Sequence, residues 1–190
     1  MRRRGIVLAV VTVALLVTAV LFTQSPAPAV EKTFEQNVRQ VVEAAFTLPP
    51  EGMEADPKLP EELQSIPTRE WLEEGLADAF AGEQALDAFC ANMIYENSHL
   101  WGALGALAAQ GPVTVSDVAL EPTVKDSAAV TFTVRYTLDG APGQGTLAGR
   151  AQHDGTGALV FMALDPRGTD AFVAALGDGF AKYRMAQKPY

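Results

Sequence analysis

Hydrophobic residues in the first half of the chain recur at the spacing of α-helices. In residues 31–47 an apolar residue or pair returns every three or four positions, which predicts a helix with one buried face. Thr33 is the expected N-cap of this helix, and Pro49 prevents it from continuing. The apolar positions are Phe34, Val38, Val41, Val42, Ala45 and Phe46.

A segment rich in proline and acidic residues separates this helix from the next. Residues 48–67 favour an extended or loop conformation, with one short turn expected at residues 61–64. Thr68 is the expected N-cap of a second helix that runs to Phe80, and Gly82 ends it. The simplest interpretation of residues 48–67 is a solvated connection.

A further helical stripe contains the only cysteine of the chain. From Leu86 onward the apolar residues follow one another in steps of three and one, and Cys90 lies in the middle of this stripe. A reactive cysteine needs exposure and a nearby cation, and no basic residue is close in sequence. Cys90 is therefore interpreted as a buried, inert thiol.

The same stretch carries His99, one of two histidines. His99 follows Glu96 by three residues, so both are expected on the polar, solvent-facing side of the helix. Asn97-Ser98 is expected to interrupt this helix before a second apolar register continues to Gly111. No further ligands stand at metal-binding spacing, so no metal site and no cofactor are expected.

After Pro112 the period of the apolar residues changes to two, which is typical of β-strands. Glycine-rich turns at residues 139–145 and 154–157 predict consecutive hairpins. A last amphipathic segment, residues 169–185, predicts a helix that Gly177 and Gly179 weaken. The expected strands are residues 113–122, 127–138, 144–154 and 157–166.

This order of elements predicts an α+β fold. N-terminal helices pack on a curved, four-stranded antiparallel sheet, a C-terminal helix follows, and one transmembrane or signal helix precedes the whole. The expected organisation is a signal anchor or signal peptide at residues 1–29 and a first helix with an acidic linker at 30–67. A cone-like α+β domain follows at 68–190, with the first helix (33–47) as part of it.

The N-terminus indicates export. Residues 5–22 form an uncharged run of 18 residues behind Arg2, Arg3 and Arg4, long enough to span a bilayer with the arginines on the cytoplasmic side. The sequence Ala-Pro-Ala at residues 27–29 instead fits a signal-peptidase site. Both alternatives place the domain on the extracytoplasmic face of the cell envelope, either attached to the membrane through residues 5–22 or secreted.

The charge of the chain limits the kinds of partner it can bind, and its cysteine content limits how the fold is stabilised. Of the 14 basic residues, three precede the apolar run. The rest of the chain has 11 basic and 23 acidic residues and therefore a net charge of −12. Such an acidic domain repels phosphate backbones, so a nucleic acid partner is not expected. A single cysteine cannot close an internal disulfide, and stability must come from packing.

Several stretches between residues 68 and 165 resemble exported bacterial members of the nuclear transport factor 2-like superfamily. That resemblance implies a cone in which helices pack into a curved antiparallel sheet. The stretches are LADAFAGEQALDAFCANMIY (76–95), VTVSDVALEP (113–122), VTFTVRY (130–136), GTLAGRAQHD (145–154) and GALVFMAL (157–164).

The resemblance leaves three functions open, because this fold hosts binders, assembly modules and enzymes. The favoured one is a non-catalytic envelope domain that binds a protein partner or a small apolar ligand. The alternatives are a membrane-anchored subunit of a conjugation or secretion apparatus and an isomerase- or cyclase-like enzyme that uses the cone cavity. The oligomeric state stays open. The candidate cavity residues are Tyr95, Trp101, Tyr136 and His153.

Overall fold

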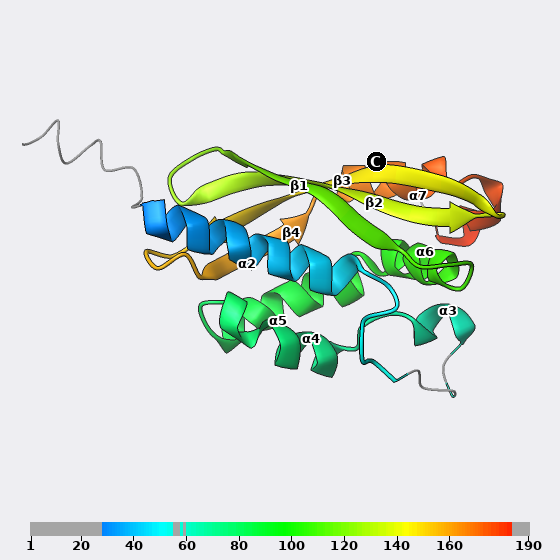
Figure 1. Ribbon diagram of the computed structural model, residues 1–190, viewed down its shortest axis with the longest axis horizontal. Coiled ribbons are helices and arrows are strands. Elements are labelled where there is room, and N and C mark those ends of the chain that lie inside the picture. Colours follow the sequence, from blue (N-terminus) through cyan, green and yellow to red (C-terminus); the bar gives the residue numbers. More distant parts are fainter. Residues whose placement is uncertain (1–27, 55–57, 59, 184–190) are drawn as a thin grey trace, which may run out of the picture.

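The computed structural model describes residues 28–54, 58 and 60–183. This part of the chain has an α+β fold, in which N-terminal helices pack on a four-stranded antiparallel sheet and a C-terminal helix follows (Figure 1). The expected anchor or signal segment, residues 5–22, lies outside the described residues. Among the helices that are described, none combines the length and apolar character needed to cross a bilayer.

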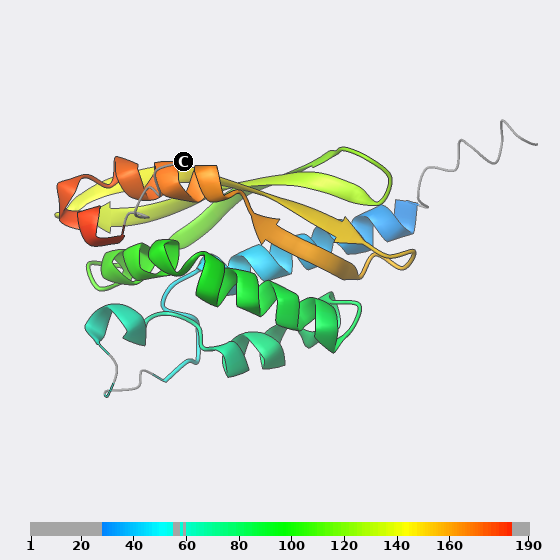
Figure 2. The ribbon, with the colours of Figure 1, turned by 180° about the vertical axis from the view of Figure 1, so that it is seen from behind.

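The helical layer precedes the sheet in the chain and lies under one of its faces (Figures 1 and 2). It includes a 3-10 turn at Ala77–Ala79 and a wide π-helical turn at Asn92–Glu96. The α-helices are α2 (Pro28–Phe46), α3 (Glu61–Gln64), α4 (Arg69–Leu76), α5 (Glu83–Ala91) and α6 (Ser98–Ala108).

Helix α2 begins earlier than the sequence predicts. It is already formed at Pro28, where the described part of the chain begins, five residues before Thr33. Thr33 is therefore not the N-cap; its hydroxyl donates to the carbonyl oxygen of Ala29 within the helix (2.9 Å). All six apolar residues predicted for the buried face are buried.

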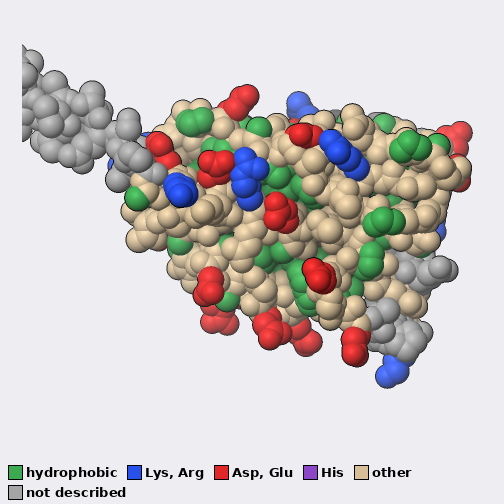
Figure 3. Space-filling model, in the orientation of Figure 1, with side chains coloured by type: hydrophobic (Ala, Val, Ile, Leu, Met, Phe, Trp, Pro, Cys, Tyr) green, Lys and Arg blue, Asp and Glu red, His purple; other side chains and the backbone are tan. Residues whose placement is uncertain are grey.

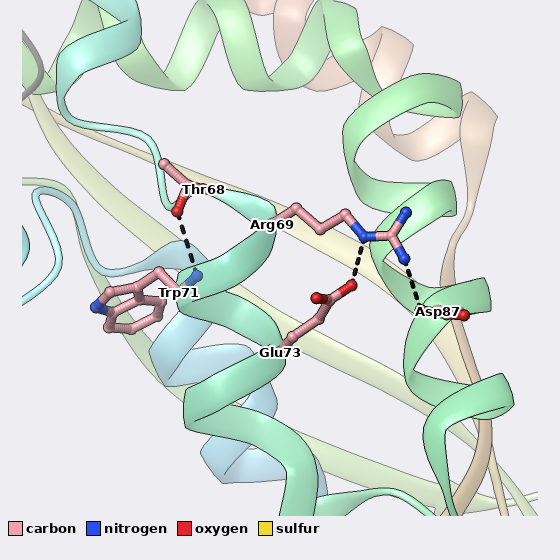
Figure 4. A network of polar contacts seen from close by, with 5 residues as sticks. All are labelled: Thr68, Arg69, Trp71, Glu73 and Asp87. Carbon is pink, nitrogen blue, oxygen red and sulfur yellow. Dashed lines mark hydrogen bonds and ion pairs between the residues drawn. The ribbon is translucent and has the colours of Figure 1, made fainter.

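The start of α4 matches the prediction. The hydroxyl oxygen of Thr68 accepts a hydrogen bond from the backbone N–H of Trp71 (3.2 Å), as an N-cap does (Figure 4). The predicted short turn in the linker is α3, and Gly82 separates α4 and its 3-10 turn from α5. Cys90, on α5, is a free and fully buried thiol.

The predicted interruption at Asn97-Ser98 is confirmed, and the wide turn explains it. The backbone N–H of Asn97 donates to the carbonyl oxygen of Asn92, five residues earlier (3.0 Å). The side-chain amide of Asn97 donates to the same oxygen (3.0 Å). Asn97 is one of few buried polar residues, and these bonds satisfy it at the junction between the wide turn and α6.

The predicted exposed pairing of His99 with Glu96 is wrong. Glu96 accepts a hydrogen bond from Asn92 instead, and the His99 side chain is only 8% exposed. Its Nε2 lies 3.3 Å from Oδ1 of Asp170. The wide turn contains one residue more than an α-helical turn and so rotates everything after it by about 100°, which brings His99 inward.

The sheet is an antiparallel meander in the order β1-β2-β3-β4. The hairpin between β2 and β3 turns at Asp139 and Gly140 alone, both with positive φ (51° and 78°). The predicted turn at 139–145 is therefore too long, because residues 141–145 already pair with β2. The strands are β1 (Thr114–Pro122), β2 (Ser127–Leu138), β3 (Ala141–His153) and β4 (Leu159–Leu164).

The inner face of the sheet and the helices enclose one hydrophobic core. On β2 the apolar residues of the predicted alternation face the helices, and Phe132 lies at the centre. The Phe132 ring lies 4.9 Å from that of Phe46 on α2, which in turn stacks on Trp101 of α6 at 5.6 Å. These three rings join α2, α6 and the sheet in one contact.

The predicted C-terminal helix is divided in two. Helix α7 (Pro166–Ala175) and a 3-10 helix (Asp178–Tyr183) are separated by Gly177, whose φ is 92°. Helix α7 lies beside the first half of β3, beyond the end of β4 (Figure 2). Its Phe172 ring packs on Gly145, where the missing side chain leaves room for it.

Candidate functional site

The four predicted cavity residues lie in three different places. Tyr95 and Trp101 line one groove together. His153 lies in a depression at the end of the molecule where α2 begins. Tyr136 packs against Phe172 of α7 with its ring edge-on (6.0 Å between centroids), and burial raises the pKa of its hydroxyl. The fold therefore brings together only one pair of the four.

The depression around His153, here called the end depression, is built by three elements. They are the first turns of α2, the β1–β2 connection together with the adjoining ends of both strands, and the last residue of β3. Its volume is about 460 Å³, within the range of small-molecule sites in proteins. Its lining comprises Glu31, Phe34, Glu35, Leu120, Pro122, Thr123, Val124, Lys125, Asp126, Ser127, Ala128 and His153.

Two buried rings form its floor. Phe34 and His153 are 7% and 5% exposed, and their ring centroids lie 4.4 Å apart. Nδ1 of His153 lies 2.6 Å from the carbonyl oxygen of Asp154. Because a carbonyl oxygen can only accept, Nδ1 carries the proton of the neutral ring, and Nε2 is left as an acceptor.

A tight turn holds this floor in place. The Asp154 carboxylate accepts hydrogen bonds from the hydroxyl and the backbone N–H of Thr156 (2.7 Å each), and these bonds lower its pKa. The side-chain amide of Asn37 on α2 donates to the carbonyl oxygen of Gly157 (3.0 Å). Sequence reasoning missed Asn37, since nothing local marks an asparagine on a helix as the partner of a turn 120 residues away.

The rim of the end depression is charged and mostly acidic. Glu31, Glu35 and Asp126 contribute carboxylates, and Lys125 contributes the one cation among the lining residues that the structure describes. Arg39 neutralises Glu35 from the next turn of α2 (2.9 Å), and Lys125 lies 4.0 Å from Asp126, so Glu31 is the rim carboxylate without an ion pair among the described residues. The rim therefore favours a neutral or positively charged group next to an apolar floor.

The second depression, here called the α3–α6 groove, has a more apolar lining and a volume of about 320 Å³. Trp101 is 4% exposed and forms its floor, whereas Tyr95 is 69% exposed and stands at its edge. Nε1 of Trp101 is buried and has no hydrogen-bond partner among the residues described. Leu63 and Ile66, from α3 and the linker, form the opposite wall.

Cys90 is unreactive for a reason that differs in part from the sequence argument. No basic residue is close to Cys90 in sequence, but Arg69, 21 residues earlier, is close enough in the fold to favour the thiolate. Burial, with Glu73 and Asp87 adding to it, outweighs Arg69 and raises the pKa of Cys90 to about 11. Within residues 28–54 and 60–183 no three His, Cys, Asp or Glu side chains are grouped as metal ligands.

Comparison with known protein families, with curated proteins and with solved structures gives no match for this chain. What the described residues define is the α+β class, with helices on one face of a four-stranded antiparallel meander.

Proposed function

We propose that this chain is an extracytoplasmic, membrane-attached domain of the nuclear transport factor 2-like superfamily that binds a small, largely apolar ligand in the end depression. The proposal of the superfamily rests on the order of elements and on the sequence stretches between residues 68 and 165. The proposal of export rests on the apolar run at residues 5–22 and the three arginines before it.

The observation that carries the ligand proposal is the floor of the end depression. A buried histidine with one free acceptor nitrogen beside a phenylalanine ring offers one polar contact in an apolar setting. Small-molecule sites combine these features, with an apolar surface for affinity and few polar groups for orientation. A ligand hydroxyl or ammonium would donate to Nε2 of His153 while its apolar part covers Phe34.

The position of the end depression agrees with a source of ligand in the membrane. Helix α2 starts at the same end of the molecule as the β1–β2 connection and the β3–β4 turn (Figure 1). Residues 5–22 precede Pro28 of α2 with only residues 23–27 between them, so an anchor would hold this end towards the bilayer. An amphiphilic molecule that leaves the membrane would reach the end depression first.

Two fluorescent probes test the proposal on the full chain in a mild detergent. Dansylcadaverine carries an ammonium group, and the dansyl derivative of aminohexanoate carries a carboxylate on a chain of similar length. The acidic rim predicts that the first binds more tightly. His153→Phe keeps the apolar bulk and removes the acceptor, and a lost hydrogen bond to a charged group weakens binding about tenfold or more.

Tyr95→Ser is the matched control, because it alters only the edge of the α3–α6 groove. The end depression would be excluded as the binding site if both probes bound with equal affinity. It would also be excluded if His153→Phe and Tyr95→Ser changed the affinity for dansylcadaverine equally.

A further inference from the structure

Among the arginines that the structure describes in this acidic protein, two form no ion pair. In the part of the chain that the structure describes, Arg39 pairs with Glu35, Arg69 with Glu73 and Asp87, and Arg135 with Asp117. Within that same part, Arg150 and Arg167 are exposed and make no ion pair.

These two arginines line the same depression, here called the outer hollow, with a volume of about 490 Å³. Arg150 is on β3 and Arg167 is in the first turn of α7. The lining consists of Ala148, Gly149, Arg150, Phe161, Ala163, Leu164, Asp165, Pro166 and Arg167.

The strand register places the outer hollow on the side of the sheet that faces away from the helices. Arg150 pairs with Ala163 across β3 and β4, and its neighbour Ala151 points into the core. Phe161 shares the outward direction with Ala163, two residues further along β4, and is 47% exposed. The small side chains at Ala148 and Ala163 leave the floor low between Phe161 and the two arginines.

One carboxylate also belongs to the lining. Asp165 is the N-cap of α7, and its Oδ1 accepts a hydrogen bond from the backbone N–H of Arg167 (3.1 Å). As the N-cap, the Asp165 carboxylate interacts with the positive N-terminal end of the helix dipole. Two guanidinium groups against one capping carboxylate leave the outer hollow positive on a chain whose formal charge is −9.

The margin of the helical layer differs from the outer hollow in charge. In the orientation of Figure 3, the charged side chains along the margin of the helical layer are mostly acidic. Positive charge beside an exposed aromatic ring is typical of the central part of protein interfaces, where arginine and phenylalanine are enriched. Arginine also binds carboxylates through two parallel hydrogen bonds, which makes it the preferred partner of acidic side chains.

We propose that the outer hollow docks an acidic peptide segment of a partner protein. Carboxylates of the segment pair with Arg150 and Arg167, and an apolar side chain between them covers Phe161. Charge complementarity and size select this occupant. A short peptide segment places its carboxylates on the two arginines alone, whereas a nucleic acid would extend over the acidic surface around them, and a free inorganic anion would leave Phe161 uncovered. This site is separate from the end depression, so each proposal stands or fails independently.

A labelled peptide of alternating glutamate and leucine tests the docking site on the full chain, by fluorescence anisotropy. The matched control peptide has glutamine in place of every glutamate. Arg150→Gln and Arg167→Gln together should weaken binding of the acidic peptide at least tenfold, since each loses a charge-assisted contact. Arg135→Gln is the control variant, because Arg135 is exposed on the same face but already pairs with Asp117.

Binding of the acidic peptide that weakens as salt is added, with little binding of the glutamine peptide, would support the proposal. Phe161→Ser should then weaken it further without changing the salt dependence. The proposal is overturned if the acidic peptide does not bind at millimolar concentration, if the double variant binds it as well as the unchanged chain does, or if inorganic phosphate competes with it at low concentration.

Discussion

His99 on α6 and Asp170 on α7 face each other across the packed interface of these two helices, with Nε2 and Oδ1 3.3 Å apart. Both atoms are shielded from solvent. Burial lowers the pKa of His99, and the charge of Asp170 opposes this effect without outweighing it. The imidazole is therefore harder to protonate in the folded chain than in the unfolded one.

This pair predicts how stability changes with pH. Because the pKa of His99 falls below 6.5 on folding, the unfolded chain binds the proton more readily. The contribution of His99 to the free energy of unfolding is then fully present above pH 6.5 and is lost as the pH falls below that value. Urea unfolding of the full chain at pH 7.5 and at pH 5 measures the difference in free energy.

Two variants isolate this contribution from that of the carboxylates. His99→Gln cannot titrate, so its loss of stability between the two pH values should be smaller than that of the unchanged chain. Asp170→Asn removes the opposing charge, lowers the pKa of His99 further and should enlarge the loss. The explanation fails if all three chains lose the same amount of stability on acidification.

The His99–Asp170 pair also shows which features the sequence could not predict. The alternation on β2 and the stripe on α2 predicted buried positions correctly, because a period of two or 3.6 depends only on local geometry. His99 was placed on the wrong face because the wide turn at Asn92–Glu96 adds a residue to the helix. Asn97-Ser98 predicted an interruption at this point but did not indicate which way α6 would face after it. A single added residue rotates every later side chain.

The candidate sites were less predictable than the fold. Trp101 and Tyr95 share a groove because they lie six residues apart on two successive helical segments. Arg150 and Arg167 were not singled out, since their shared hollow depends on how α7 turns back beside β3. Whether a charged side chain has a partner is a property of the whole fold, so composition alone could not identify this pair.

The start of α4 provides a prediction about stability. Thr68→Ala removes the hydroxyl that accepts from the N–H of Trp71, and losing an N-cap of this kind costs about 1 kcal/mol (Figure 4). Arg69→Met removes ion pairs to Glu73 and Asp87 that are exposed to solvent and therefore weak, and it should cost less than the loss of the N-cap. Urea unfolding would contradict this ranking if the arginine variant proved the less stable of the two.

Cys90 should be chemically silent in the folded chain. With a pKa of about 11, roughly one thiol in a thousand is ionised at pH 8, and burial blocks access to that fraction. A disulfide reagent such as dithionitrobenzoate should therefore release about one equivalent of product only after urea is added. Rapid reaction without urea, at the rate of a free thiol, would show that Cys90 is accessible.

Gly145 makes the contact between β3 and α7 a sensitive test of the C-terminal packing. A Cβ at this position would lie 2.7 Å from two ring carbons of Phe172, a side chain only 5% exposed. Gly145→Ala should thus force the ring and α7 away from the sheet, and overpacking of this kind costs about 1–3 kcal/mol.

Gly75→Ala in α4 is the matched control, since nothing lies within 4 Å of the added carbon and alanine favours the helix by about 1 kcal/mol. Urea unfolding should then shift in opposite directions for the two substitutions. If Gly145→Ala left the stability unchanged, α7 would not be packed on β3 as closely as the Phe172 contact requires.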